Sequence, residues 1–326
     1  MCERDGFFSG AATVVALGLF LNNSSSLTAR SSGIPGILAH RGVHQTFSTE
    51  GLTRDTCTAA RINPPTNQYL ENTKSSITAS FAVGATALEI DVHPTTDGEF
   101  AIFHDWGLEC RTNGKGVTRE QSMSYLKSLD LGYGYTADGG QTYPFRGKGV
   151  GLMPTLAEVL TSYPGHRFLI NIKSNDSSEA DRLVAYLAKL GVKADGDLWI
   201  FADGEPRLRL AQIAPKARVI GKKDLKTCSM AYLALGWSGA VPGSCRGKFI
   251  AIPTNLAPLF WGWPNRLIKR MEEADVEIML VGPVGRGGGI GVDDPADLSA
   301  VPEGFHGVIM TDNIEIIGPA VRRLSR

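Results

Sequence analysis

The chain has 326 residues, of which 43% are hydrophobic and 20% charged, so it can bury a sizeable core and is not a disordered protein. Lys plus Arg and Asp plus Glu each number 33, which leaves no formal net charge. A nucleic-acid-binding protein usually carries a basic excess, so this balance argues against a nucleic-acid partner. The length is suited to one (β/α)₈ barrel of about 250 residues with insertions.

Residues 7–21 form an uninterrupted run of apolar and small side chains, followed by the polar run 22–26. This run is short for a transmembrane helix but fits the apolar region of a signal peptide. Arg4 lies between two acidic residues and no clear cleavage site follows, so an apolar tail packed on the surface is the alternative. We expect residues 1–33 to be a leader or membrane anchor with a linker.

That expectation predicts an exported protein, either periplasmic or membrane-anchored, which associates with the membrane through its N-terminal segment. A cytoplasmic protein is the alternative.

From residue 34 onward, short β-rich apolar runs alternate with helical patterns, which is typical of βαβ units. Eight parallel strands with crossover helices predict a closed (β/α)₈ TIM barrel over residues 34–326. Helices are expected around 183–190 and 267–271, and over 154–160 and 319–324. The predicted strands span residues 36–40, 87–92, 167–172, 198–202, 217–221, 248–253, 276–281 and 307–311.

Two connections are longer than ordinary loops. Residues 41–71 follow the first predicted strand, and residues 104–153 follow the second. Both should rise from the carboxyl ends of the strands, where barrel enzymes carry their active sites. The second connection is rich in glycine and tyrosine, and we interpret about 105–153 as a small irregular insertion or lid.

The second predicted strand carries two carboxylates, Glu89 and Asp91. Side chains alternate faces along a strand, so these two point to one side while Leu88, Ile90 and Val92 point to the other. Two inward carboxylates repel each other unless a cation lies between them, and Mg²⁺ or Ca²⁺ is suited to that position. Taken alone, the pair is better explained as exposed carboxylates at a strand end, which are common in proteins.

Two histidines, His40 and His104, lie at the ends of predicted strands or hairpins beside these carboxylates. Imidazole titrates near neutrality, and phosphodiester cleavage needs one group to deprotonate the nucleophile and another to protonate the leaving alkoxide. Arg41 offers a forked donor for phosphate oxygens, and Lys173 at the end of the third predicted strand can stabilise charge on a phosphoryl group.

At this point the sequence resembles the glycerophosphodiester phosphodiesterase family, over about residues 36–318. The ordered elements that carry the resemblance are His40-Arg41-Gly42, Glu71-Asn72-Thr73, Glu89 with Asp91, Asp97-Gly98, His104-Asp105, Lys173 and Thr311-Asp312.

The resemblance implies metal-dependent hydrolysis of a small-molecule glycerophosphodiester to glycerol 3-phosphate and an alcohol. It implies that His40 and His104 are the acid–base pair, and that Arg41 and Lys173 contact the phosphate. The implied metal ligands are Glu89, Asp91, Glu71 and Asn171. The family usually has an acidic ligand at the last of these positions, so Asn171 predicts weaker binding of Mg²⁺ or Ca²⁺, because an amide oxygen coordinates without charge.

Two other functions remain as alternatives. Phospholipase D-like cleavage of a lipid phosphodiester would use the same kind of barrel, with Phe260, Trp261 and Trp263 as a lipid-facing patch. A non-catalytic barrel that binds a phosphate ligand is suggested by Asn171, although the presence of both histidines argues against it.

Four cysteines lie outside the leader, and no C-x-x-C pair suggests zinc. Cys57 and Cys110 belong to the two long connections, which adjacent parallel strands deliver to the same end of the barrel. Cys228 and Cys245 bracket one short segment. We therefore predict Cys57–Cys110 and Cys228–Cys245 disulfides, as suits an exported protein; four reduced cysteines in a cytoplasmic protein are the alternative.

Overall fold

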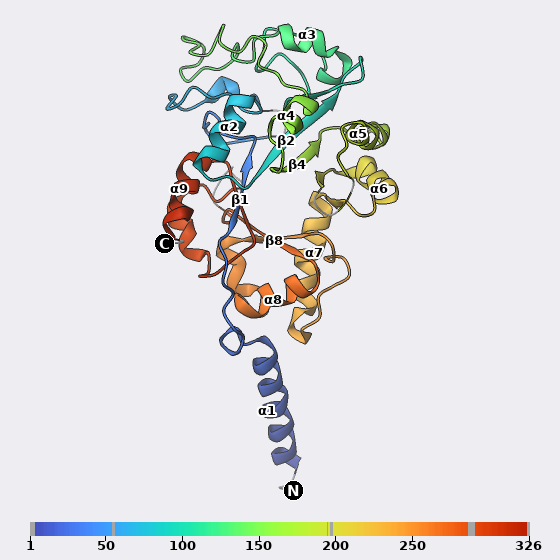
Figure 1. The fold of residues 1–326 in the computed structure, drawn as a ribbon. Coiled ribbons are helices and arrows are strands. Elements are labelled where there is room, and N and C mark those ends of the chain that lie inside the picture. Colours follow the sequence, from blue (N-terminus) through green and yellow to red (C-terminus); the bar gives the residue numbers. More distant parts are fainter. Residues whose placement is uncertain (1–3, 54–55, 194, 196–197, 286–290, 325–326) are drawn as a thin grey trace.

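The computed structural model describes residues 4–53, 56–193, 195, 198–285 and 291–324, with side chains described from residue 13 to residue 323. Eight parallel strands form a nearly closed barrel in the order β6-β5-β4-β2-β1-β9-β8-β7 (Figure 1). All eight predicted strands are confirmed. They are β1 (Gly36–His40), β2 (Ala87–Pro94), β4 (Arg167–Ile172), β5 (Trp199–Phe201), β6 (Arg218–Ile220), β7 (Phe249–Pro253), β8 (Glu277–Val281) and β9 (Val308–Thr311).

A ninth strand, β3 (Phe100–Ile102), was not predicted as a strand. It pairs antiparallel with β2 across the turn at Asp97-Gly98, with Val92 opposite Ile102. This hairpin extends β2 beyond the barrel and delivers the segment that begins at Phe103 back to the carboxyl end of the strands. Three residues are too few for the alternating pattern on which strand prediction depends.

Helices cover the outside of the barrel, and the four helical regions expected from the sequence are present. The helices are α1 (Arg4–Asn23), α2 (Lys74–Val83), α3 (Met123–Ser128), α4 (Leu156–Ser162), α5 (Ser178–Lys189), α6 (Gly204–Ile213), α7 (Lys222–Leu235), α8 (Asn265–Glu273) and α9 (Ile314–Leu324). Short 3₁₀ turns span η1 (Ser25–Leu27), η2 (Ala59–Arg61), η3 (Thr118–Glu120), η4 (Gly236–Ser238), η5 (Thr254–Leu259) and η6 (Pro295–Ala300).

The strands are buried on both faces, as a parallel barrel requires. On β2, Leu88, Ile90 and Val92 belong to the large apolar cluster between the barrel and its helices. The inward-facing Ala87 packs in a separate cluster inside the barrel. This alternation confirms the predicted faces of β2 and leaves Glu89 and Asp91, both buried, inside the barrel at its carboxyl end.

The two long connections pack together into a small subdomain with its own core, at the top of Figure 1. Residues from 59–70 and from 101–153 share this core. Close approaches of backbone explain some of its glycines: a Cβ on Gly134 would lie 1.9 Å from the carbonyl oxygen of Cys110. The insertion is therefore irregular in outline but closely packed.

Both predicted disulfides are present. Cys57–Cys110 joins the two long connections across a sequence separation of 53 residues. Cys228–Cys245 joins α7 to the segment before β7 across a separation of 17 residues.

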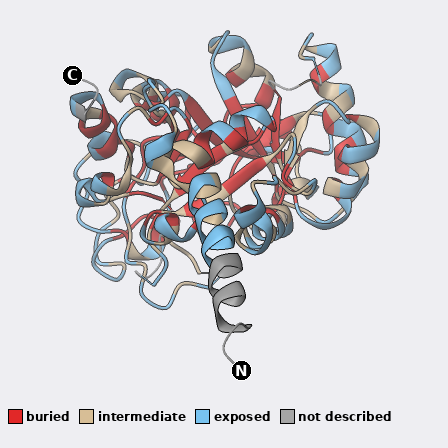
Figure 2. Cartoon of the chain, turned by 90° about the horizontal axis from the view of Figure 1, so that it is seen from below, coloured by how far each residue is buried: buried red, intermediate tan, exposed pale blue. Residues whose placement is uncertain are grey.

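The N-terminal segment forms α1, which projects from the body of the protein on the side away from α3 (Figure 1). Near its end, the Arg270 side chain of α8 donates to the carbonyl oxygen of Asn22 at 2.7 Å and to Asn23 Oδ1 at 3.1 Å. Apolar side chains on the described part of α1, including Val14 and Phe20, are exposed (Figure 2). Within the residues that the structure describes, no helix has the combined length and apolarity to cross a bilayer.

Candidate active site

The site begins where β1 ends, at His40-Arg41-Gly42. Arg41 adopts a left-handed backbone with φ of 62°, and its carbonyl oxygen accepts from Asn72 N at 2.9 Å. A Cβ on Gly42 would lie 2.2 Å from Ser76 Oγ on α2, so only glycine fits there. Strained backbone of this kind is typical of functional sites, and here it directs Arg41 across the mouth of the barrel.

Strand register places the polar side chains next to one another. His40 pairs with Glu89 between β1 and β2, and Asp91 pairs with Asn171 between β2 and β4. All four side chains therefore meet at the carboxyl ends of three adjacent strands.

His40 lies between two carboxylates. Its Nδ1 contacts Asp312 Oδ1, just after β9, and its Nε2 lies 3.7 Å from Glu89 Oε2. Burial and Arg41 lower the pKa of His40, but Asp312 and Glu89 outweigh them, so that the pKa is raised overall. The structure thus favours the imidazolium form of His40.

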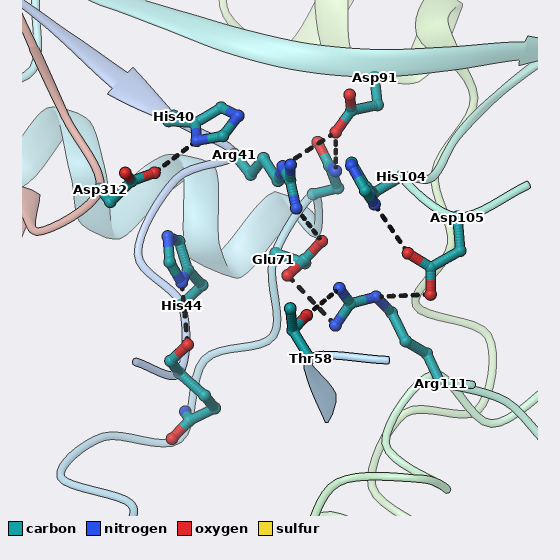
Figure 3. Close-up of polar contacts among 12 residues, drawn as sticks. His40, Arg41, His44, Thr58, Glu71, Asp91, His104, Asp105, Arg111 and Asp312 are labelled. Carbon is teal, nitrogen blue, oxygen red and sulfur yellow. Dashed lines mark hydrogen bonds and ion pairs between the residues drawn. The ribbon is translucent and has the colours of Figure 1, made fainter. Parts of the chain in front are cut away.

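The environment of His104 shifts its pKa in the other direction. Its Nδ1 lies 2.7 Å from Oδ1 of the neighbouring Asp105. Burial and the positive charge of Arg41 nevertheless lower the pKa of His104, against the attraction of Asp91 and Asp105. The site therefore contains one histidine with a raised pKa and one with a lowered pKa, each oriented by a carboxylate on Nδ1 (Figure 3).

Asp91 is fully buried and surrounded by donors. Lys173 Nζ lies 3.1 Å and Arg41 Nε 3.3 Å from its carboxylate oxygens, and the amides of Asn72 and Asn171 donate to it at 3.0 and 3.1 Å. Burial alone would raise the pKa of Asp91, but Lys173 and Arg41 hold it well below its usual range. Asp91 is therefore ionised.

Glu89 is less well compensated. Burial and the charge of Asp91 raise the pKa of Glu89 to about 7. Its Oε1 accepts from Asn171 Nδ2 at 2.8 Å, but its buried Oε2 has no hydrogen-bond partner. A buried carboxylate oxygen without a donor is a position where a cation would be stabilised.

Glu71 faces two arginines. Arg41 and Arg111 each lie 3.3 Å from one of its carboxylate oxygens. Burial raises the pKa of Glu71, but the two arginines and His104 outweigh that effect and lower it. Glu71 is thus placed in the network beside the carboxylate pair, with its charge directed toward guanidinium groups.

These contacts bear on the predicted metal site. Among the described residues, no cluster of three or more His, Cys, Asp or Glu side chains has a metal-binding arrangement. Glu89 and Asp91 fit a divalent cation as two ligands, because one oxygen of Glu89 accepts no hydrogen bond. Asn171 fits as a third if its amide turns by half a rotation, since nitrogen and oxygen of an amide are assigned from hydrogen bonding. Glu71 is a further carboxylate of the network, linked to Asp91 through Arg41.

Several residues of this network were given no role from the sequence. Asp312 and Asp105 orient the histidines, and Arg111, in the insertion, pairs with both Glu71 and Asp105. The adjacency of His104 and Asp105 was a visible signal, whereas Arg111 follows Cys110 with no pattern to distinguish it. His44 is also buried beside the site, with Nδ1 on the carbonyl oxygen of Gln45 at 3.0 Å and a pKa lowered by burial.

Fold and site together define a (β/α)₈ barrel that presents two carboxylate-oriented histidines and several cations around buried acidic groups. Residues 40–195 match the model of the glycerophosphoryl diester phosphodiesterase family. This match confirms the resemblance found in the sequence.

Relatives named as glycerophosphodiester phosphodiesterases are similar in sequence to this chain over part of their length. A glycerophosphodiester phosphodiesterase of Bacillus subtilis (strain 168) is 33% identical over 125 residues, covering 36% of this chain and 41% of that protein. One of Caldanaerobacter subterraneus subsp. tengcongensis is 32% identical over 103 residues, covering 32% and 39%. The matched segment thus spans about two fifths of these relatives.

Solved structures share the fold over nearly the whole chain. A glycerophosphodiester phosphodiesterase of Agrobacterium tumefaciens has a TM-score of 0.57 at 22% identity, covering 89% of this chain and all of its own. The corresponding domain of protein Rv2277c of Mycobacterium tuberculosis has a TM-score of 0.60 at 17% identity, covering 87% and 98%.

Asp312→Asn should lower the pKa of His40. The carboxylate of Asp312 favours the protonated imidazole, and asparagine keeps the shape of the side chain but removes its charge. The pKa can be followed by NMR titration of the His40 ring protons, with His306, at the amino end of β9, as an internal control. An unchanged pKa would show that Asp312 does not contact His40 in solution.

Proposed function

We propose that the protein hydrolyses glycerophosphodiesters to glycerol 3-phosphate and an alcohol. The observation that carries this proposal is the pair of histidines, His40 and His104, each with a carboxylate on Nδ1 and both beside the cationic side chain of Arg41. The family supplies the substrate class. A structurally similar phosphodiesterase of Oleispira antarctica (TM-score 0.52, 18% identity) was solved with the product sn-glycerol-3-phosphate.

In this mechanism, Arg41 and Lys173 attract the phosphodiester and stabilise the charge that develops on its oxygens. Both already pair with Asp91, which fixes their direction at the mouth of the barrel. His104, with its lowered pKa, is suited to accept a proton from the nucleophile. The nucleophile is either water, or a neighbouring substrate hydroxyl that forms a cyclic phosphate which water then hydrolyses. His40, with its raised pKa, is suited to donate one to the leaving alkoxide.

Replacing either His40 or His104 with Ala should lower kcat by about 10²-fold or more, because each transfers a proton in the reaction. Melting temperature should change little, since both side chains are partly exposed at the site. The measurement is release of glycerol 3-phosphate from glycerophosphocholine, with His306→Ala as a matched histidine control away from the site. If both variants retain near-normal turnover, the two-histidine mechanism is wrong.

The same assay separates the alternatives. Turnover of lysophosphatidylcholine but not of glycerophosphocholine would favour cleavage of a lipid phosphodiester. Phe260 is buried and so cannot belong to a lipid-facing patch, although Trp261 is 38% exposed. Binding of glycerol 3-phosphate without any turnover would instead favour the non-catalytic barrel.

We further propose that Glu89, Asp91 and the Asn171 amide oxygen hold Mg²⁺ or Ca²⁺, with Glu71 as an additional carboxylate beside them. When bound, the cation would act as a Lewis acid on a phosphoryl oxygen. Support comes from Glu89, whose Oε2 accepts no hydrogen bond and whose pKa is raised to about 7, since a cation would relieve the repulsion between the two carboxylates. Members of the family generally use a divalent metal.

Chelation should abolish activity, and Mg²⁺ or Ca²⁺ should restore it. Asn171→Glu should tighten metal binding, because it adds a negative ligand at the position where the family usually has one. Isothermal titration calorimetry measures the affinity, and Asn175→Glu, which adds the same charge in the loop after β4, is the control. An affinity equal to that of the unaltered protein would remove Asn171 from the metal site.

We also propose that the protein is exported and stays associated with the membrane surface through α1. Two disulfides support an oxidising compartment, and the exposed apolar side chains of α1, such as Val14, Val15 and Phe20, support contact with lipid.

Fractionation of the native host should place the full chain with membranes and a chain lacking residues 1–23 in the soluble fraction of the exporting compartment, if a separate signal replaces the leader. Mass spectrometry of a non-reduced digest should find both disulfides. Four free thiols in protein from the native host would contradict export.

A further inference from the structure

Arg111 links the two halves of the site. Its guanidinium group is buried, with Nε 3.0 Å from Asp105 Oδ2 and one terminal nitrogen 3.3 Å from Glu71 Oε2. Besides these two ion pairs, Arg111 donates hydrogen bonds to the hydroxyl of Tyr135 at 2.9 Å and to Thr58 Oγ1 at 2.8 Å. The planar guanidinium group of Arg111 thus contacts both Asp105, which bonds to His104, and Glu71 (Figure 3).

The Cys57–Cys110 disulfide lies directly beside this arginine. Cys57 precedes Thr58 and Cys110 precedes Arg111, so the covalent bond spans the same two segments that the Arg111–Thr58 hydrogen bond joins. The Arg111 backbone is fixed as well, because its carbonyl oxygen accepts from Gly134 N at 3.2 Å. The bridge therefore limits the position from which the guanidinium reaches the site.

The direction of His104 depends on this arrangement. Asp105 uses Oδ1 for the Nδ1 of His104 and Oδ2 for Arg111, so the arginine fixes the carboxylate that orients the imidazole. Among the charged causes that lower the pKa of Asp105 against its burial, Arg111 is the largest. Movement of Arg111 would thus let the carboxylate turn and the imidazole with it.

We propose that Arg111, held by the Cys57–Cys110 disulfide, is a positioning residue for His104 and Glu71. The bridge then serves the chemistry of the site in addition to the stability of the insertion. This inference rests on the proposed function, because it assigns Arg111 a part in the same reaction.

The chain supplies a matched control in its second disulfide. Cys228 and Cys245 are fully buried in the main apolar cluster between α7 and β7, and neither adjoins a side chain of the site. Cys57 and Cys110 are partly exposed and pack against the core of the insertion. Loss of either bridge should reduce stability, but only loss of Cys57–Cys110 should reduce turnover at a temperature where the protein stays folded.

The first test compares C57S/C110S with C228S/C245S, using release of glycerol 3-phosphate. We expect kcat to fall about 10-fold or more in C57S/C110S with KM changed less, because a displaced acid–base group impairs the transition state more than substrate binding. C228S/C245S should retain the kcat of the unaltered protein.

Brief treatment of the native protein with dithiothreitol tests the same point without a substitution. The reagent reduces the partly exposed Cys57–Cys110 bridge to two thiols before it reduces the buried bridge, and is itself oxidised to a cyclic disulfide. We expect kcat to fall in this first phase of reduction.

The second test addresses Arg111 directly and needs no turnover. The ¹⁵N chemical shifts of the His104 imidazole report which nitrogen carries the proton and how strongly it is bonded. They should change in R111Q and in C57S/C110S but not in C228S/C245S. R111K should recover part of kcat relative to R111Q, because it restores the charge beside Asp105 but not the fork that also reaches Glu71.

Equal kcat in the two double-serine variants, or His104 shifts in R111Q identical to those of the unaltered protein, would overturn the inference. Failure of the unaltered protein to cleave any phosphodiester would count against the proposed function instead. In that case the ¹⁵N shifts still decide whether Arg111 and its bridge position His104.

Discussion

The constraint on which the site depends is the burial of two carboxylates, Glu89 and Asp91, on the inner face of one strand. Removing a carboxylate from water costs on the order of several kcal/mol unless charge and hydrogen bonds compensate it. Asp91 receives that compensation from Lys173, Arg41 and two amides, so it remains ionised with no exposed surface. Glu89 receives less compensation, so its pKa is raised and its Oε2 accepts no hydrogen bond.

Much of the local geometry follows from that compensation. Arg41 can reach Asp91 and Glu71 because its backbone turns into the left-handed region immediately after β1, and Gly42 allows α2 to approach closely. The cations that neutralise Asp91 are also the side chains best suited to a phosphate. A substrate anion at the mouth of the barrel would therefore meet donors whose directions are already set, which is the condition for electrostatic stabilisation of a transition state.

The pKa values of the two histidines are shifted in opposite directions within one site. Both are partly buried and both have a carboxylate on Nδ1, yet the second neighbour differs. His40 also faces Glu89, whereas His104 is affected more by Arg41 than by any carboxylate. The insertion brings Arg111 to Asp105, the carboxylate that orients His104, and has a separate apolar core beside that contact.

The sequence by itself determined the barrel, its eight parallel strands and the faces of β2, because a period of two and alternating βα segments are local properties of the chain. It also determined both disulfide pairings. The order of parallel strands brings the connections of Cys57 and Cys110 to one end of the barrel, and Cys228 and Cys245 bracket a single short segment. Strand β3 was not predicted, because three residues are too few to show the alternating pattern of a strand. Only the tertiary structure decided that Asp312 would meet His40 across 272 positions, and that Arg111 would pair with Glu71 and Asp105. Such contacts depend on strand register and on the packing of two long connections, and neither leaves a periodic pattern in the residues themselves.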